Sequence, residues 1–134
     1  MTTDEILKMK SGYELDNLVA HRVMGWTLRA EDGIYVLDPK DDSIFGSMWG
    51  VSNDAPMAWE PSENMFPTWT MEEHLLSLNL HLRYTQALCV VFLHDGPLPE
   101  RDEQANWQFI HATPHQRCRA ALLTVNSVPN IQYR

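Results

Sequence analysis

The side chains in this chain that are best suited to chemistry are basic ones in its C-terminal half. His115, Arg117 and Arg119 lie close together, and Arg83 precedes them. Arginine carries planar donors that make paired, charge-assisted bonds to phosphate, so the cluster is typical of a site for a small anionic ligand. The alternative is that Arg119 is a surface arginine paired with Asp or Glu, or that it fixes an oligomer interface. The sequence favours neither interpretation over the other.

A nucleotide-like ligand also needs a flat apolar surface for its base, and Phe92 and Trp107 are the candidates. Both precede the basic cluster, on predicted strands that lead into it. A core position is the competing interpretation for each ring, and a buried Trp107 would need a partner for its indole N–H. The candidate ligand-binding residues are therefore Arg119, His115, Arg117, Arg83, Phe92 and Trp107.

The sequence carries no pattern that indicates catalysis. It has no Gly-rich phosphate loop, nucleophile elbow or zinc-protease helix, so we expect no enzyme activity, no catalytic residues and no cofactor. His111, His115 and Cys118 form the most metal-like group. Pro114 begins a helix between the two histidines, however, so they do not share a helical face, and we expect no metal site. Paired carboxylates in loops and first helical turns are expected to be solvated.

The basic cluster is expected on a helix over residues 114–127. Thr113 and Gln116 have the spacing of a capping box, and Pro114 suits the first helical position, where its missing N–H costs nothing. The apolar residues Cys118 and Leu122 recur at helical spacing and predict the buried face. This placement leaves His115 and Arg119 along one edge of the helix and Arg117 along the other. An arginine at such an edge can keep its stem packed and its guanidinium free.

Two further helices are predicted from capping boxes at their first turns. Thr2 with Glu5 predicts a helix over residues 3–20. Thr70 with Glu73 predicts one within residues 62–77, although Pro67 would interrupt a helix that begins early in this range.

Alternation in the sequence predicts the strands. Residues 78–84 alternate between apolar and polar side chains, as a strand with one buried face does. The apolar run over residues 88–94 and the segment 105–112 predict two more strands. Residues 25–28 and 34–37 predict a hairpin.

The predicted fold class is α+β. We expect one domain over residues 1–134, in which an antiparallel sheet of four to five strands packs as a sandwich against two or three helices. Residues 39–61 are predicted to form a long loop, for which a flexible insertion is a commoner explanation than a functional segment.

Composition limits the classes of partner. The chain has 134 residues, 44% hydrophobic content and a formal net charge of −8, so its average surface repels nucleic-acid polymers. The sequence lacks the roughly 18 consecutive apolar residues of a membrane span, so no membrane association is expected. Cys89 and Cys118 lie in apolar runs, which suits reduced thiols in the cytoplasm.

Two segments carry a resemblance to a known family. MTTDEILKMKSGYELDNLVAHRVMGWTL opens the chain, and PHQRCRAALLTV lies near its end. Together they resemble the bacteriophage ABA sandwich domain proteins, and the similarity covers residues 1–28, residues 61–78 more loosely, and residues 105–125. The segments also resemble the anti-Thoeris sponge proteins, which bind nucleotide-derived immune signals without cleaving them. The resemblance implies that basic groups of the closing helix hold the ligand's phosphates. Arg119 occupies the arginine of the CRAALL motif, and His115 stands where relatives carry a further arginine.

Two hypotheses about function follow. The first is a phage anti-defence protein in the cytoplasm of the infected bacterial host. As a homo-oligomer, it would sequester a cyclic ADP-ribose-like or cyclic nucleotide immune signal. The second is an acidic interaction protein that blocks a basic site on a host nucleic-acid-binding or defence protein. A concave pocket of arginines and aromatics would favour the first. One continuous acidic face would favour the second, formed by Asp41, Asp42, Glu60, Glu100, Asp102 and Glu103.

Overall fold

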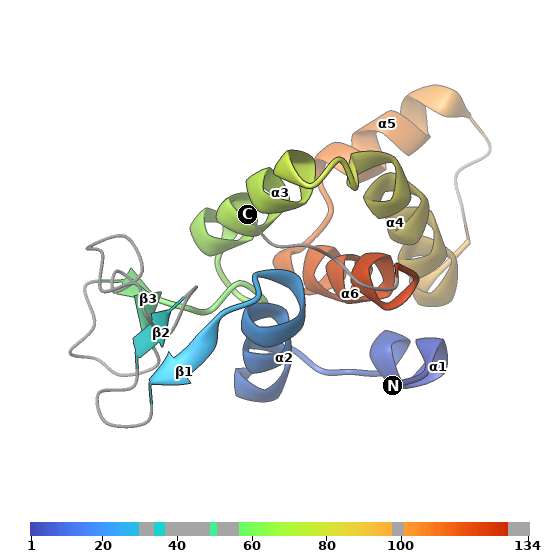
Figure 1. Ribbon diagram of the computed structural model, residues 1–134. Coiled ribbons are helices and arrows are strands. Elements are labelled where there is room, and N and C mark those ends of the chain that lie inside the picture. Colours follow the sequence, from blue (N-terminus) through green and yellow to red (C-terminus); the bar gives the residue numbers. More distant parts are fainter. Residues whose placement is uncertain (30–33, 37–48, 51–56, 98–100, 129–134) are drawn as a thin grey trace.

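The structure is a computed structural model that describes residues 1–29, 34–36, 49–50, 57–97 and 101–128, and it is built mainly of helices (Figure 1). For residues 27–29, 34–36, 49–50, 57–58, 102 and 105, the structure describes the backbone only. The helical elements are α1 (Thr3–Leu7), α2 (Tyr13–Leu18), the π-helical turn η1 (Val19–Val23), α3 (Met65–Ser77), α4 (His81–Asp95), α5 (Asp102–Ile110) and α6 (Pro114–Asn126).

Helix α6 lies at the centre of the helical body and packs against α4, η1, α3, α1 and α2 (Figure 1). Its start is the predicted one, since the Thr113 side chain accepts from the Gln116 backbone N–H and the Gln116 side chain accepts from Thr113 N–H. All residues from Cys118 to Val125 are buried. A helix that is buried all round is a core helix, so α6 offers no broad exposed face near its middle.

The first predicted helix is divided into three parts. The capping box of Thr2 and Glu5 starts α1 as predicted, but the helix ends at Leu7. Gly12 then has a φ of 134°, a region that side chains disfavour, and its N–H donates to Ser62 Oγ at 2.9 Å. The chain restarts as α2 and continues into η1. The glycine turn explains why a single helix over residues 3–20 is wrong.

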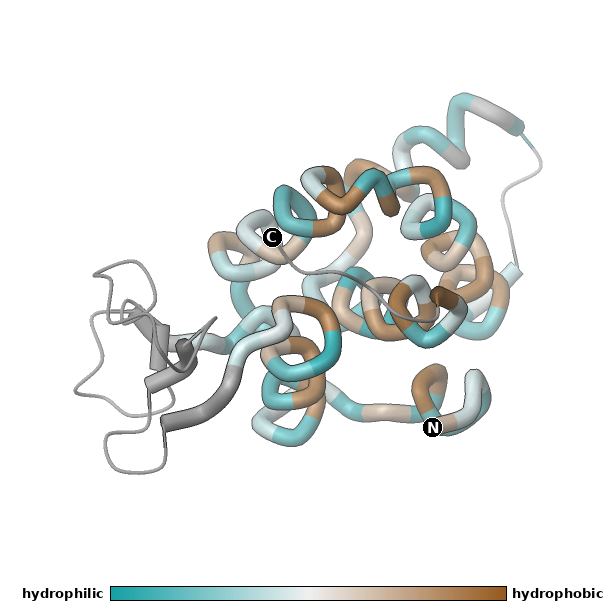
Figure 2. The backbone as a smooth tube through the Cα atoms, viewed as in Figure 1, coloured by the Kyte–Doolittle hydropathy of each residue, from teal (hydrophilic) through white to brown (hydrophobic). Residues whose placement is uncertain are grey.

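The strands predicted over residues 78–84 and 88–94 are wrong, because both ranges contribute to helix α4. Its buried residues are Tyr84, Ala87, Leu88, Val91 and Phe92, which follow the three- and four-residue spacing of one helical face. Figure 2 shows apolar positions along both α4 and α6, the two helices that form much of the core.

The strand predicted over residues 105–112 is also wrong, since most of this range forms α5. Phe109 of this helix packs against Phe92, with ring centroids 5.4 Å apart. Helices α3 and α6 match the predicted ranges closely. The thiols of Cys89 and Cys118 are both free, as predicted, and burial raises the pKa of Cys118.

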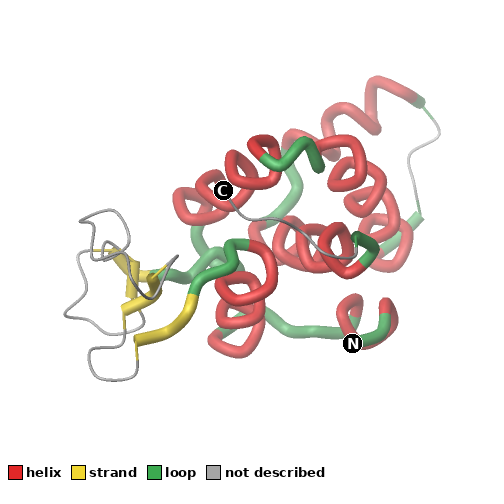
Figure 3. Tube along the Cα trace, viewed as in Figure 1, coloured by secondary structure: helices red, strands yellow, loops and turns green. Residues whose placement is uncertain are grey.

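Four short strands lie at one end of the helical body (Figure 3). Strands β1 (Thr27–Arg29) and β2 (Ile34–Val36) pair antiparallel, which confirms the predicted hairpin, while its turn lies outside the described residues. Strands β3 (Trp49–Gly50) and β4 (Met57–Ala58) complete the sheet in the order β1-β2-β3-β4. Each strand has only two or three residues, and the core lies between helices. The predicted α+β sandwich is therefore wrong, and the domain is helical.

Candidate anion-binding hollow

Arg119 lies in the interior of the protein, so the prediction of a free guanidinium is wrong. Its side chain is 4% exposed and forms a two-pronged ion pair with Asp95 at 3.0 and 2.6 Å. It also donates to the backbone carbonyl of Leu7 at 3.0 Å. The hydrogen bonds from Arg119 hold the pKa of the Asp95 carboxyl well below its usual range. The arginine of the CRAALL motif thus ties α6 to α1 and to the end of α4.

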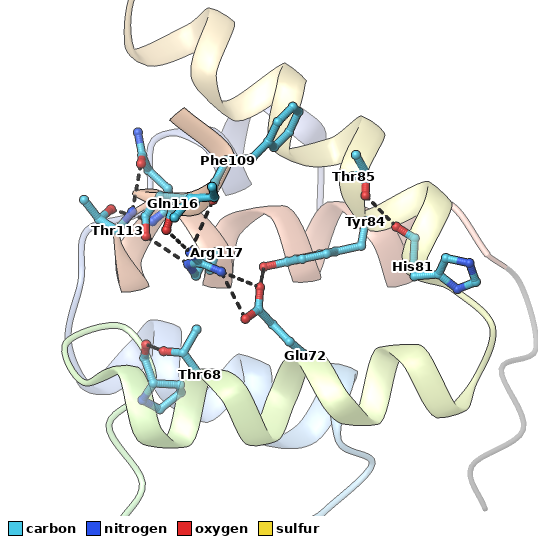
Figure 4. Close-up of polar contacts among 12 residues, drawn as sticks. Thr68, Glu72, His81, Tyr84, Thr85, Phe109, Thr113, Gln116 and Arg117 are labelled. Carbon is cyan, nitrogen blue, oxygen red and sulfur yellow. Dashed lines mark hydrogen bonds and ion pairs between the residues drawn. The ribbon is translucent and has the colours of Figure 1, made fainter. Parts of the chain in front are cut away.

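Arg117 is also engaged within the protein, on a different side of α6 (Figure 4). Its Nη1 donates to both carboxylate oxygens of Glu72 on α3, at 2.8 and 3.1 Å. Its Nε donates to the Ala112 carbonyl at 2.9 Å. The Tyr84 hydroxyl donates to the same Glu72 carboxylate, and burial followed by that negative charge raises the pKa of Tyr84. Arg117 therefore joins α3, α4, α5 and α6 as a structural residue.

The other three candidates near this end of the chain do not converge on a common pocket. His115 Nε2 lies 2.6 Å from the backbone carbonyl of Met9, so this nitrogen carries the proton and donates. Phe92 is 2% exposed and belongs to the core. Trp107 is 65% exposed on α5 and stacks on His111, with ring centroids 4.1 Å apart. None of the three lines the hollows of about 310, 410 and 700 Å³ in the described part of the chain.

Arg83 differs from the other two arginines because its side chain is exposed. Among the described residues it has no hydrogen-bond or ion-pair partner. It borders a shallow hollow of about 310 Å³ between α4 and the end of α6. Gln86 and Ser127 add polar side chains to the rim, and Leu123 adds to the apolar floor. Of the six candidate residues, Arg83 is the one whose charge remains available to a ligand.

A second hollow, of about 410 Å³, lies on another side of α6 and was not predicted from the sequence. We call it the Arg22 hollow. Its apolar wall comes from Met1, from α1, from the last turns of α6 and from Val128, which lies two residues beyond α6. Its lining residues are Met1, Ile6, His21, Arg22, Leu122, Val125, Asn126 and Val128.

The described lining of the Arg22 hollow includes two basic side chains. His21 and Arg22 are both exposed at the end of η1, and no carboxylate is among its described lining residues. His21 Nδ1 lies 2.9 Å from the Trp26 carbonyl, so Nδ1 carries the proton and donates to it. The described lining therefore combines two basic side chains with an apolar wall in a chain whose net charge is −8.

Asp16 is a buried acid whose contacts stabilise the fold. It is 5% exposed, and its Oδ1 accepts from the Ser62 backbone N–H at 2.8 Å. Its carbonyl accepts from the indole N–H of Trp59, which packs on Trp26 with ring centroids 4.6 Å apart. Burial raises the pKa of Asp16 to about 6. This network attaches the segment before α3 to α2.

The described residues contain no group of three His, Cys, Asp or Glu side chains placed to hold a metal ion. Within the same part of the chain, no helix is long and apolar enough to cross a membrane.

Comparison with known proteins finds no family model, no curated protein and no solved structure that matches this chain. The resemblance to the phage ABA sandwich family therefore stays a prediction that rests on the two sequence segments. The sandwich fold that it implies is not the fold of this structure.

Proposed function

We propose that this protein binds a small anionic ligand derived from a nucleotide, without cleaving it, in the Arg22 hollow. The observation that carries the proposal is the combination of residue types that line this hollow. In an acidic protein, this hollow places an arginine and a histidine beside an apolar wall, with no carboxylate among the described residues that line it.

The two kinds of lining residue suit the two parts of a nucleotide. The guanidinium of Arg22 can make paired, charge-assisted bonds to a phosphate group. The side chains of Met1 and Val128, which are at least partly exposed, provide apolar surface for a base or ribose. A volume of about 410 Å³ falls within the roughly 300–1,000 Å³ typical of small-molecule sites.

Binding without turnover would make the protein a sponge for a signal. A phage protein that holds a cyclic ADP-ribose-like or cyclic nucleotide signal would lower its free concentration in the host cytoplasm and so silence the defence effector. This role requires affinity but no catalytic group. The proposal moves the site from Arg119 and Arg117 to the opposite end of α6, because both of those arginines are engaged in the interior.

Titration calorimetry with cyclic ADP-ribose isomers and cyclic di- and trinucleotides tests the proposal. Arg22→Ala should weaken binding by roughly 10- to 150-fold, the equivalent of about 1.5–3 kcal/mol for a hydrogen bond to a charged group. The affinity of Arg22→Lys should lie between those of the wild type and Arg22→Ala, because lysine keeps the charge and lacks the planar donors. Arg101→Ala is the matched control, since Arg101 is exposed at the N-cap of α5 and lies outside the hollow. If the wild type binds none of these compounds, the proposal fails.

The acidic interaction protein is the second candidate, and the net charge of −8 supports it. Glu60 and Glu103 are exposed. Of the other acids expected on a continuous face, Asp41, Asp42 and Glu100 lie outside the described residues, as does the side chain of Asp102.

A further inference from the structure

Helix α3 carries apolar side chains on two opposite faces. Its inner face is buried, through Pro67, Thr68, Met71 and Leu75. On the outer face, Phe66, Trp69 and Leu76 are 54%, 55% and 57% exposed.

The exposed side chains form a stripe because of their spacing. Positions 66, 69, 73 and 76 follow the three- and four-residue steps that place side chains on one side of a helix. We call this set, Phe66, Trp69, Glu73 and Leu76, the α3 stripe. Helices that are apolar on both faces are usually covered on both sides. Helix α3 packs against protein on its inner face, but its outer face is largely exposed.

The charged side chains that neighbour the stripe in the described sequence are acidic. The described residues 57–82 include no Lys or Arg, and their acids are Glu60, Glu63, Glu72 and Glu73. Glu72 is paired with Arg117, while Glu63 and Glu73 are exposed near the apolar side chains. An acidic rim around an apolar centre is complementary to a partner with basic side chains around apolar ones.

We propose that the α3 stripe docks a cationic amphipathic segment of a partner protein. The segment would place apolar side chains on Trp69 and Leu76 and Lys or Arg beside Glu63 and Glu73. This surface is separate from the Arg22 hollow, because no residue of α3 lines that hollow.

A second copy of this chain is a poorer occupant for two reasons. An isologous contact would bring Glu73 and Glu63 of both copies together, and like charges repel. The exposed parts of the three apolar side chains also amount to only on the order of 300 Å². A stable interface covers about 800 Å² on each partner, so the α3 stripe suits the centre of a transient contact.

Fluorescence anisotropy with two labelled helical peptides tests the proposal. Both peptides carry the same apolar positions, and one is flanked by Lys where the other is flanked by Glu. The wild-type chain should bind the Lys peptide saturably and the Glu peptide at least about tenfold more weakly. Trp69→Ser should weaken binding of the Lys peptide at least about tenfold. Trp107→Ser, the matched control on α5, should change it by less than about twofold.

Each other outcome overturns the docking proposal. These outcomes are no saturable binding, equal affinity for the two peptides, or equal losses in the two tryptophan variants. Sedimentation that shows a wild-type dimer abolished by Trp69→Ser would assign the stripe to a second copy instead. If Trp69→Ser lowers the melting temperature markedly, Leu76→Ser replaces it. Arg22→Ala should bind the Lys peptide like the wild type, so this test fails or succeeds independently of the anion site.

Discussion

Arg119 and Asp95 form an ion pair, and replacing one partner should destabilise the protein more than replacing the other. The Arg119 side chain is 4% exposed, whereas that of Asp95 is 30% exposed. Replacing Asp95 with Asn would leave a buried guanidinium without a counter-charge. Replacing Arg119 with Met would leave a carboxylate that water can reach and that still accepts from Gln116 Nε2 at 3.0 Å.

The expected magnitudes follow from this difference in burial. Removing one partner of a fully buried pair costs about 3–5 kcal/mol, so Asp95→Asn should lower the free energy of unfolding by about 3 kcal/mol. Arg119→Met keeps most of the packed stem, and a partly hydrated carboxylate reduces the electrostatic loss. We expect about 1–2 kcal/mol for this variant.

Urea unfolding followed by far-ultraviolet circular dichroism measures both free energies. Asp4→Asn serves as the control, because the Asp4–Lys8 pair is exposed on α1 and such pairs contribute only about 0.3–0.5 kcal/mol. The reasoning is refuted if Arg119→Met costs as much as Asp95→Asn, or if both variants behave like the surface control. The second result would mean that Arg119 is available to a ligand after all.

Three further predictions concern stability and assembly. Burial raises the pKa of Asp16 to about 6, so its contribution to stability is fully present below its ordinary pKa of 3.8 and is lost as pH rises through 6. Asp16→Asn should therefore raise the free energy of unfolding at pH 7 by on the order of 1–3 kcal/mol in urea unfolding, with no gain near pH 4. Leu122→Ala should cost roughly 2–5 kcal/mol in the same assay, because Leu122 is 1% exposed, and a loss under ~1 kcal/mol would contradict its burial. Light scattering at tens of micromolar, a range that reveals weak dimers, should show a homo-oligomer, and a stable monomer would contradict that expectation.

Helix starts were predictable where a few neighbouring residues decide them. The boxes at Thr2 and Thr113 are confirmed, because each depends only on a hydroxyl and a side chain three residues later. The box at Thr70 is wrong, since α3 has already begun and Thr70 Oγ1 donates to the Phe66 carbonyl. Pro67 does not interrupt α3, because it lies in the first turn, where no N–H is required.

The strand predictions over residues 78–84, 88–94 and 105–112 failed because short apolar runs do not distinguish a strand from a buried helix. The alternation from Leu78 to Leu82 spans the turn between α3 and α4. The three- and four-residue spacing from Tyr84 onward was the signal that could have revealed α4. Packing against α6 outweighs the strand preference of its valines and phenylalanine.

The site was harder to predict because its contacts join distant parts of the chain. Asp95 is 24 residues from Arg119, and Glu72 is 45 from Arg117, so sequence spacing alone did not reveal either pair. The Arg22 hollow likewise exists only where α1, η1 and α6 meet. The adjacent His21 and Arg22 were the available signal, inside the opening segment that carries the family resemblance.

Mass spectrometry of small molecules released from the protein by heat tests the central claim most directly. Wild-type chain and Arg22→Ala would be purified from bacteria in which a nucleotide immune signal has been induced. The proposed function predicts that the wild type releases a phosphate-bearing nucleotide derivative and that Arg22→Ala releases at least about tenfold less. Release of no such compound from the wild type, or of equal amounts from both proteins, would contradict the claim.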